Sequence, residues 1–111
     1  MMPSMAKKPA LTLSPETLVA TRQLGAALRA ARIRRRLTQA QLASRTGTGV
    51  ATIQRMERGE PGLSIGTLLE TLAVLERSWL GELVQRVADD APGRQMEQRR
   101  LPKRVVHREE F

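Results

Sequence analysis

The sequence contains no cysteine and no tyrosine, and it has only one tryptophan, one phenylalanine and one histidine in 111 residues. Without cysteine, the chain has neither disulfide bonds nor thiolate metal ligands, which is consistent with a reducing cytoplasm. No apolar run is long enough to span a bilayer, and the N-terminus lacks the apolar block of a signal peptide. We therefore expect a cytoplasmic protein that does not associate with membranes.

Residues that commonly carry catalysis are also scarce. The single histidine, His107, lies in a polar C-terminal stretch, where an isolated histidine is usually an exposed bystander. Gly47 and Gly49 do not follow a predicted strand, so they do not form a phosphate-cradling loop. The acidic residues show neither a paired-carboxylate spacing nor a metal-ligand spacing. We therefore expect no enzymatic activity, no bound metal and no cofactor.

Positive charge is what the chain has in excess. Nineteen lysines and arginines against eleven acidic residues give a formal net charge of +8 and a pI near 11.5, which favours a polyanionic partner. Many basic proteins bind no polyanion, so this charge is informative only when it surrounds a recognition element. Because recognition of single-stranded RNA relies on aromatic stacking, the scarcity of aromatic residues disfavours an RNA partner.

The stretch Thr38–Glu60 reads as two short helices joined by a tight turn. Thr38 and Gln41 have the spacing of a capping box, so a helix is predicted to begin at Gln39. Gly47 is suited to end it, since glycine adopts a positive φ without steric cost. A second helix is predicted over residues 50–58. Two helices separated by a glycine turn are typical of a helix-turn-helix, whose second helix lies in the DNA major groove.

This pattern resembles the lambda-repressor-like DNA-binding domains, also called the Cro/C1-type or XRE family. The resemblance implies an all-α, compact five-helix domain over residues 14–88. It also implies a sequence-specific regulator of transcription that binds double-stranded DNA, and we expect a homodimeric repressor. The matching residues span residues 18–87 and are Leu24, Leu28, Arg32, Gln39, Leu42, Ala43, Gly47, Ile53, Met56, Glu57, Gly59, Leu68, Leu72 and Ala73.

The resemblance also implies which residues face DNA. Gln39 matches a glutamine that contacts phosphate in the family, and base reading falls to the start and outer face of the helix 50–58. Arg55 and Gln54 are suited to guanine and adenine edges, whereas Val50 and Ala51 offer only methyl groups to thymine. We expect modest direct readout with added phosphate contacts and DNA shape. The expected DNA-binding residues are Arg34, Arg35, Arg36, Gln39, Thr48, Gly49, Val50, Ala51, Thr52, Gln54 and Arg55.

Several assignments stay open at this stage. Family members often carry Ser, Thr or Gln where this chain has Gly49, Val50 and Ala51, so a helix that no longer reads DNA specifically remains an alternative. The arginines at 34–36 can contact phosphate or complement the negative end of a helix dipole. The glycine common in the family is Arg36 here, which leaves the shape of that turn open. Arg32 is expected to form a structural ion pair with Glu57.

The flanking helices supply the core and a potential interface. Ser14, followed by proline, is predicted to begin a first helix that ends near Arg36, and Ser64 a fourth. A fifth helix is predicted from Ser78. Family members commonly dimerise in this region, although Trp79 fits a core position equally well. The expected dimer-interface residues are Trp79, Leu80, Leu83 and Val84.

Both ends of the chain differ in composition from the domain between them. Residues 1–13 show no apolar periodicity and are expected to form a flexible N-terminal arm. Residues 89–111 are expected to form a basic, flexible C-terminal tail that is disordered or folds on a partner. The layout is also similar to that of HipB-like antitoxins, repressors that hold a kinase-type toxin. A toxin-binding antitoxin that represses its own operon is therefore the alternative function, with a toxin protein as the additional partner.

Overall fold

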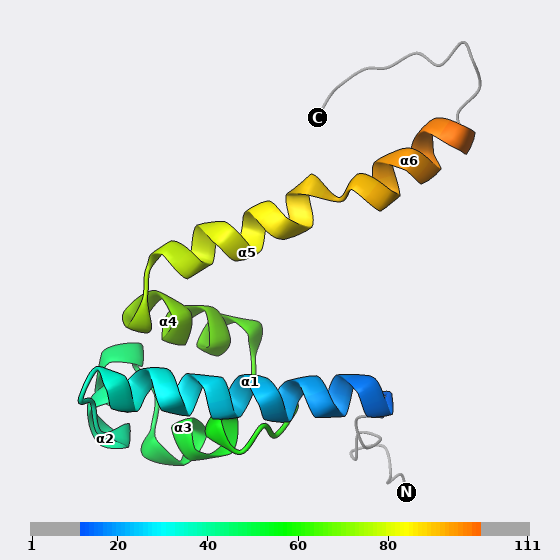
Figure 1. Cartoon of the computed structure of the whole chain (residues 1–111). Helices are drawn as coiled ribbons and strands as arrows, with labels where there is room; N and C mark the ends of the chain where they lie inside the picture. Colours follow the sequence, from blue (N-terminus) through cyan, green and yellow to red (C-terminus); the bar gives the residue numbers. More distant parts are fainter. Residues whose placement is uncertain (1–11, 101–111) are drawn as a thin grey trace, which may run out of the picture.

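The computed structural model describes residues 12–100, and every regular element in that part of the chain is a helix (Figure 1). The prediction of an all-α helix-turn-helix fold is confirmed. Residues 1–11 of the expected arm and residues 101–111 of the expected tail, including His107, lie outside the described residues. The helices are α1 (Pro15–Arg34), α2 (Gln39–Thr46), α3 (Val50–Glu57), α4 (Ile65–Leu75), α5 (Ser78–Asp89) and α6 (Ala91–Arg100).

Helix α1 begins as predicted but ends two residues early. The Ser14 hydroxyl accepts a hydrogen bond from the Thr17 backbone N–H at 3.1 Å, which satisfies one of the free donors of the first turn. At the other end the backbone of Arg36 has φ of 57°, so the helix stops at Arg34 rather than near Arg36. Arginine thus occupies the left-handed position that glycine adopts most easily.

Local capping defines the two helices of the central motif. The Thr38 hydroxyl accepts from the Gln41 N–H at 3.0 Å, and the Gln41 side chain accepts from the Thr38 N–H at 2.8 Å. Gly47 ends α2 with φ of 73°. The predicted capping box and glycine C-cap are therefore confirmed. Both could be predicted from the sequence because they depend on residues within one helical turn.

The core lies where α1, α2, α3 and α4 meet. Helix α1 packs on α3, and α2 packs on both α3 and α4. A second layer of half-buried leucines from the loop before α4, from α4 itself and from the α1–α2 turn surrounds this core. The buried apolar residues are Leu28, Ala31, Leu42, Ala43, Ile53, Met56 and Leu75.

Helices α5 and α6 extend away from this core (Figure 1), and neither contains a buried residue. Trp79 is half-buried and packs against the core, whereas Val84 is 64% exposed. Residues 91–100, which we expected to belong to a flexible tail, form α6. The described part of the chain therefore contains one helix more than the five predicted.

Two glycines allow α1 to approach the end of α3 closely. A Cβ atom on Gly25 would lie 2.6 Å from the Met56 carbonyl oxygen, and one on Gly59 would lie 2.5 Å from the Arg22 Cα. Gly59 also has φ of 77°. Backbone therefore meets backbone at this crossing, with no room for even one methyl group.

We expect Gly25→Ala to lower the free energy of unfolding by about 1–3 kcal/mol, the usual effect of overpacking a rigid site. Gly66→Ala is the matched control, because Gly66 lies in α4 and a Cβ there meets nothing within 4 Å. The control should be neutral or slightly stabilising. Urea unfolding followed by circular dichroism measures both variants, and equal stabilities would contradict the close approach.

Candidate nucleic-acid interface

The turn between α2 and α3 is held by short-range hydrogen bonds. The Thr48 N–H donates to the Ala43 carbonyl at 3.0 Å, and the hydroxyls of Thr46 and Thr48 lie 3.0 Å apart. Gly49 precedes α3 in an extended conformation. These contacts set the direction in which α3 leaves the turn, and therefore which of its faces points outward.

Helix α3 has a buried face and an exposed face. Ile53 and Met56 are 0% and 4% exposed and belong to the core, and Glu57 is buried beside them. Thr48 and Thr52 are half-buried at the edge of the helix. The expected reading residues Gly49, Val50, Ala51, Gln54 and Arg55 are all exposed.

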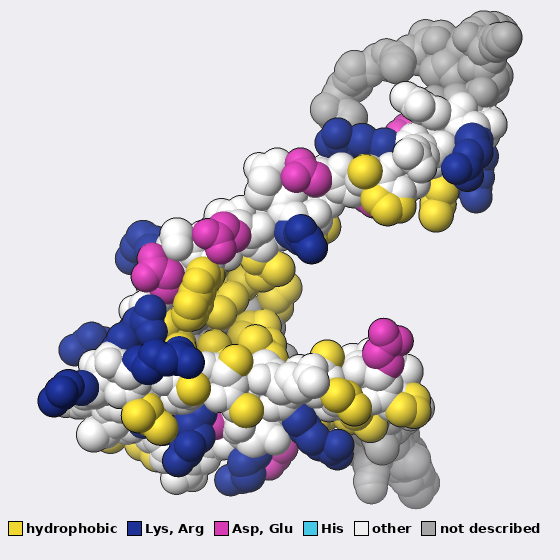
Figure 2. Space-filling view, viewed as in Figure 1, with side chains coloured by type: hydrophobic (Ala, Val, Ile, Leu, Met, Phe, Trp, Pro, Cys, Tyr) yellow, Lys and Arg dark blue, Asp and Glu magenta, His cyan; other side chains and the backbone are white. Residues whose placement is uncertain are grey.

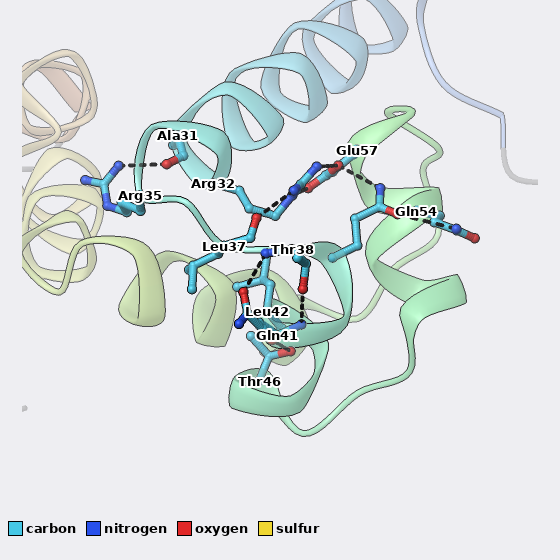
Figure 3. A network of polar contacts seen from close by, with 11 residues as sticks. Ala31, Arg32, Arg35, Leu37, Thr38, Gln41, Leu42, Thr46, Gln54 and Glu57 are labelled. Carbon is cyan, nitrogen blue, oxygen red and sulfur yellow. Dashed lines mark hydrogen bonds and ion pairs between the residues drawn. The ribbon is translucent and has the colours of Figure 1, made fainter.

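A buried ion pair joins α1 to the end of α3 (Figure 3). The Arg32 Nε donates to Glu57 Oε2 at 2.6 Å, and its Nη2 donates to Glu57 Oε1 at 3.0 Å. The Arg32 Nη1 donates to the Leu37 carbonyl at 2.8 Å. The guanidinium therefore also ties down the turn between α1 and α2, and the structure contains the ion pair expected from the resemblance.

Two opposing effects act on the Glu57 carboxylate. Burial raises its pKa, because a low-dielectric surrounding disfavours the charged form. Hydrogen bonds from Arg32 and Gln39, together with the positive charges of Arg32 and Arg29, lower it and prevail. The pKa of Glu57 therefore lies below its ordinary value of 4.5.

Gln39 connects this ion pair to the exposed face of α3. Its Nε2 donates to Glu57 Oε1 at 3.1 Å, and its Oε1 accepts from the Nε2 of Gln54 at 3.4 Å. The sequence placed Gln39 only as a phosphate contact, and this link to Gln54 was not anticipated. The residues are too far apart in the chain for spacing rules to join them.

The three arginines at the end of α1 lie in different surroundings. Arg34 and Arg36 are exposed. Arg35 donates from Nη1 to the Ala31 carbonyl at 3.0 Å, lies 3.8 Å from Glu76, and stacks 5.5 Å from the Trp79 ring centroid. Its guanidinium is therefore directed toward the α4–α5 junction, which makes it a weaker candidate for a phosphate contact than its neighbours.

A basic hollow lies beside the start of α2, and the sequence did not single out one of its residues. Arg29 and Arg36 line the hollow together with Arg32, Thr38 and Gln39. Arg29 is exposed and lies one helical turn before Arg32. The spacing of one helical turn from Arg32 was the sequence signal that could have placed Arg29 near the start of α2.

Other kinds of site find no support in residues 12–100. No three or more His, Cys, Asp or Glu side chains there are placed to hold a metal ion. No helix among them is both long enough and apolar enough to cross a bilayer.

The geometry defines a helix-turn-helix protein, a class in which the second helix of the motif enters the major groove. The model of the helix-turn-helix domain family matches residues 23–87, more than half of the chain, and the protein belongs to this family. The crystal structure of the clp gene regulator ClgR from Corynebacterium glutamicum is similar, with 23% sequence identity and a TM-score of 0.44, covering 72% of this chain and 93% of that one. No curated protein sequence matches this chain.

The lowered pKa of Glu57 makes stability depend on acid pH. Since the folded pKa lies below the unfolded value near 4.5, this group's stabilisation is complete above that value and is lost as the pH falls through the folded pKa. We expect the free energy of unfolding to decrease in that window. Glu57→Gln should remove this contribution, whereas Glu16→Gln on the exposed first turn of α1 should leave it in place. Urea unfolding between pH 2 and 7 measures this for the wild type and both variants. The same dependence of the free energy of unfolding on pH in all three proteins would contradict the expectation.

Proposed function

We propose that the protein is a sequence-specific regulator of transcription that inserts α3 into the major groove of double-stranded DNA. One observation carries this proposal. The inner residues of α3 are buried with Glu57 in the ion pair, while Val50, Ala51, Gln54 and Arg55 form an exposed edge. A short helix whose outer side chains are exposed, and whose inner side is anchored to α1, is suited to enter a groove.

The chemistry of this edge supports a limited code. Arg55 is suited to the O6 and N7 atoms of guanine, and Gln54 to the N6 and N7 atoms of adenine. Val50 and Ala51 can contact only a thymine methyl group. The remaining specificity would come from DNA shape and from the half-buried hydroxyls of Thr48 and Thr52 beside Gly49.

Phosphate contacts would position the domain on the duplex. Arg34 and Arg36 are exposed at the end of α1. Arg29 and Gln39 line the basic hollow beside the start of α2. Arg35, held against Trp79 and Glu76, would add to the positive field without donating directly. The net charge of +8 supports salt-dependent association with DNA.

Arg55→Ala tests the direction of α3. We expect a loss of about 1–3 kcal/mol in binding free energy and a relaxed preference at one base position, because a bidentate contact is removed. Arg77→Ala, at the exposed start of α5, removes the same charge away from α3 and should change affinity little. Both effects can be measured by fluorescence anisotropy on a site selected from a random DNA pool. Unchanged affinity and preference in Arg55→Ala would show that the assigned edge is wrong.

The exposed side of α5 supports homodimerisation. Leu83, Val84 and Val87 are 42%, 64% and 70% exposed, and Leu80 is half-buried next to them. The spacing of these four residues is the same read from either end of the helix. An antiparallel α5 from a second copy would therefore place Leu80 on Val87 and Leu83 on Val84. Such self-complementarity is what a two-fold interface requires.

A hollow beside α5 adds to this surface. Figure 2 shows apolar side chains lining the space between α1 and α5, to which Leu24, Leu72, Trp79 and Leu83 contribute. The proposed interface residues are Trp79, Leu80, Leu83 and Val84, as the resemblance implied, together with Val87. A dimer would present two α3 helices to half-sites about one helical turn apart, roughly 34–36 Å, and repress by covering a promoter.

Leu83→Glu should convert the dimer to a monomer, because it places a charge in the apolar stripe. The control is Gln85→Glu, which adds the same charge to the opposite, exposed side of α5. Sedimentation velocity would report a monomer for Leu83→Glu and a dimer for the control and the wild type. If all three sediment as the same species, α5 does not form the interface.

The antitoxin alternative draws support from α6. This helix contains no buried residue, exposes Met96, and carries Arg94, Arg99 and Arg100 beyond the core. A helix with no buried residue offers its whole surface to a toxin protein. A kinase-like gene next to the gene for this protein would favour that function.

A further inference from the structure

The turn after α1 holds Arg36 in a left-handed conformation. The Arg36 N–H donates to the Ile33 carbonyl at 2.9 Å. The next N–H, that of Leu37, donates to the Arg32 carbonyl at 3.2 Å. These two hydrogen bonds form a Schellman motif, which ends a helix around one left-handed residue that is usually glycine. The φ of 57° at Arg36 is therefore imposed by the turn and not by its own side chain.

No contact of the Arg36 side chain compensates for this conformation. A left-handed residue other than glycine is strained, because its Cβ approaches a carbonyl oxygen. Asp90, the other such residue in the described part of the chain, accepts a hydrogen bond from the Gly93 N–H at 3.0 Å through its Oδ1. The Arg36 side chain is exposed and forms no hydrogen bond or ion pair within residues 12–100. Strained residues of this kind cluster at functional sites.

A second unengaged guanidinium borders the same basic hollow. Arg29 lines the hollow together with Arg36, is exposed, and forms no side-chain hydrogen bond or ion pair with residues 12–100. By contrast, all three guanidinium nitrogens of Arg32 are engaged. Two cations beside one open hollow repel each other, and an anion between them removes this cost. A phosphate suits the place, because its oxygens can accept from two guanidinium groups at once.

We infer that Arg29 and Arg36 bind one phosphate of the DNA backbone between them, and that Arg36 makes this contact at the expense of the stability of the fold. The inference rests on the proposed function, in which α3 enters the adjacent major groove. Glycine at position 36 would relieve the left-handed conformation but would remove one of the two guanidinium groups. Residue 36 should therefore act in opposite directions on folding and on DNA binding.

Urea unfolding of the full-length chain tests the effect on folding. Arg36→Gly should raise the equilibrium constant for folding roughly twofold to tenfold, since the relief of strain exceeds the greater freedom of glycine in the unfolded chain. Arg36→Asn should change it in the same direction, because asparagine also tolerates this conformation. The matched control is Arg34→Gly, which removes the same charge from the last residue of α1. Glycine at this helical position should lower the constant roughly twofold to fivefold.

Fluorescence anisotropy on a DNA site selected with the wild-type protein tests the effect on binding. Arg36→Gly and Arg29→Ala should each weaken binding roughly fivefold to fiftyfold, by the same factor on the single-base variants of the site. Each should also make the slope of log K against log salt concentration shallower by about one. Arg36→Lys keeps both the charge and the strain, so it should retain wild-type stability and part of the affinity.

Duplexes with one neutral methylphosphonate in each half-site test whether the two arginines share a phosphate. At one position of the scan, the wild type should lose affinity while Arg36→Gly and Arg29→Ala lose no more than they already have. At the other positions the difference between wild type and variants should persist. Different positions for the two variants would overturn the shared contact.

Two further results would overturn the inference and leave the proposed function intact, provided that Arg55→Ala still weakens binding. One is an Arg36→Gly protein that is no more stable than the wild type. The other is a more stable Arg36→Gly protein with unchanged affinity and salt slope. If Arg55→Ala also leaves affinity and base preference unchanged, the proposed function fails as well.

Discussion

The arrangement of α1 and α3 depends on the buried ion pair between Arg32 and Glu57. The three nitrogens of the Arg32 guanidinium all donate, two to Glu57 and one to the Leu37 carbonyl. Removing two charges from water is costly unless each one is fully paired. Removal of one partner from such a buried pair commonly costs about 3–5 kcal/mol, so the two helices can move relative to each other only at a large penalty. The ion pair thus acts as a rigid crosslink between the scaffold and the proposed reading helix.

This crosslink allows a helix of only eight residues to present a defined edge. Isolated helices of this length are not stable in water, so α3 depends on its buried side. Ile53 and Met56 provide apolar contact with the core, and the close approach at Gly25 and Gly59 brings the α1 backbone against the end of the helix. The outer side chains then need to contribute nothing to stability. Small apolar residues such as Val50 and Ala51 can therefore occupy this exposed side of α3.

Much of the fold was predictable because its signals are local. Thr38 with Gln41, Gly47, Ser14 and Ser64 each act within one helical turn, and all four define helix ends as expected. Arg36 shows the limit of such rules. Its positive φ shortens α1, and no propensity favours an arginine there. Residues 91–100 contain few apolar residues and are expected to lie in a flexible tail, yet they form a helix whose side chains are exposed on all sides.

Local patterns in the chain predicted the helix-turn-helix and its caps and indicated which residues of the second helix point outward, because the 3.6-residue period and glycine conformations act over a few residues. Tertiary structure decided what each polar side chain touches. Gln39 meets Glu57 across 18 positions, and Arg35, just after α1, reaches Trp79 in α5. Which polar side chains bond to one another, and which arginine is already engaged, depends on how α1 packs on α3 and on how the residues after α1 meet the α4–α5 junction. Only the folded chain brings those side chains within hydrogen-bonding distance.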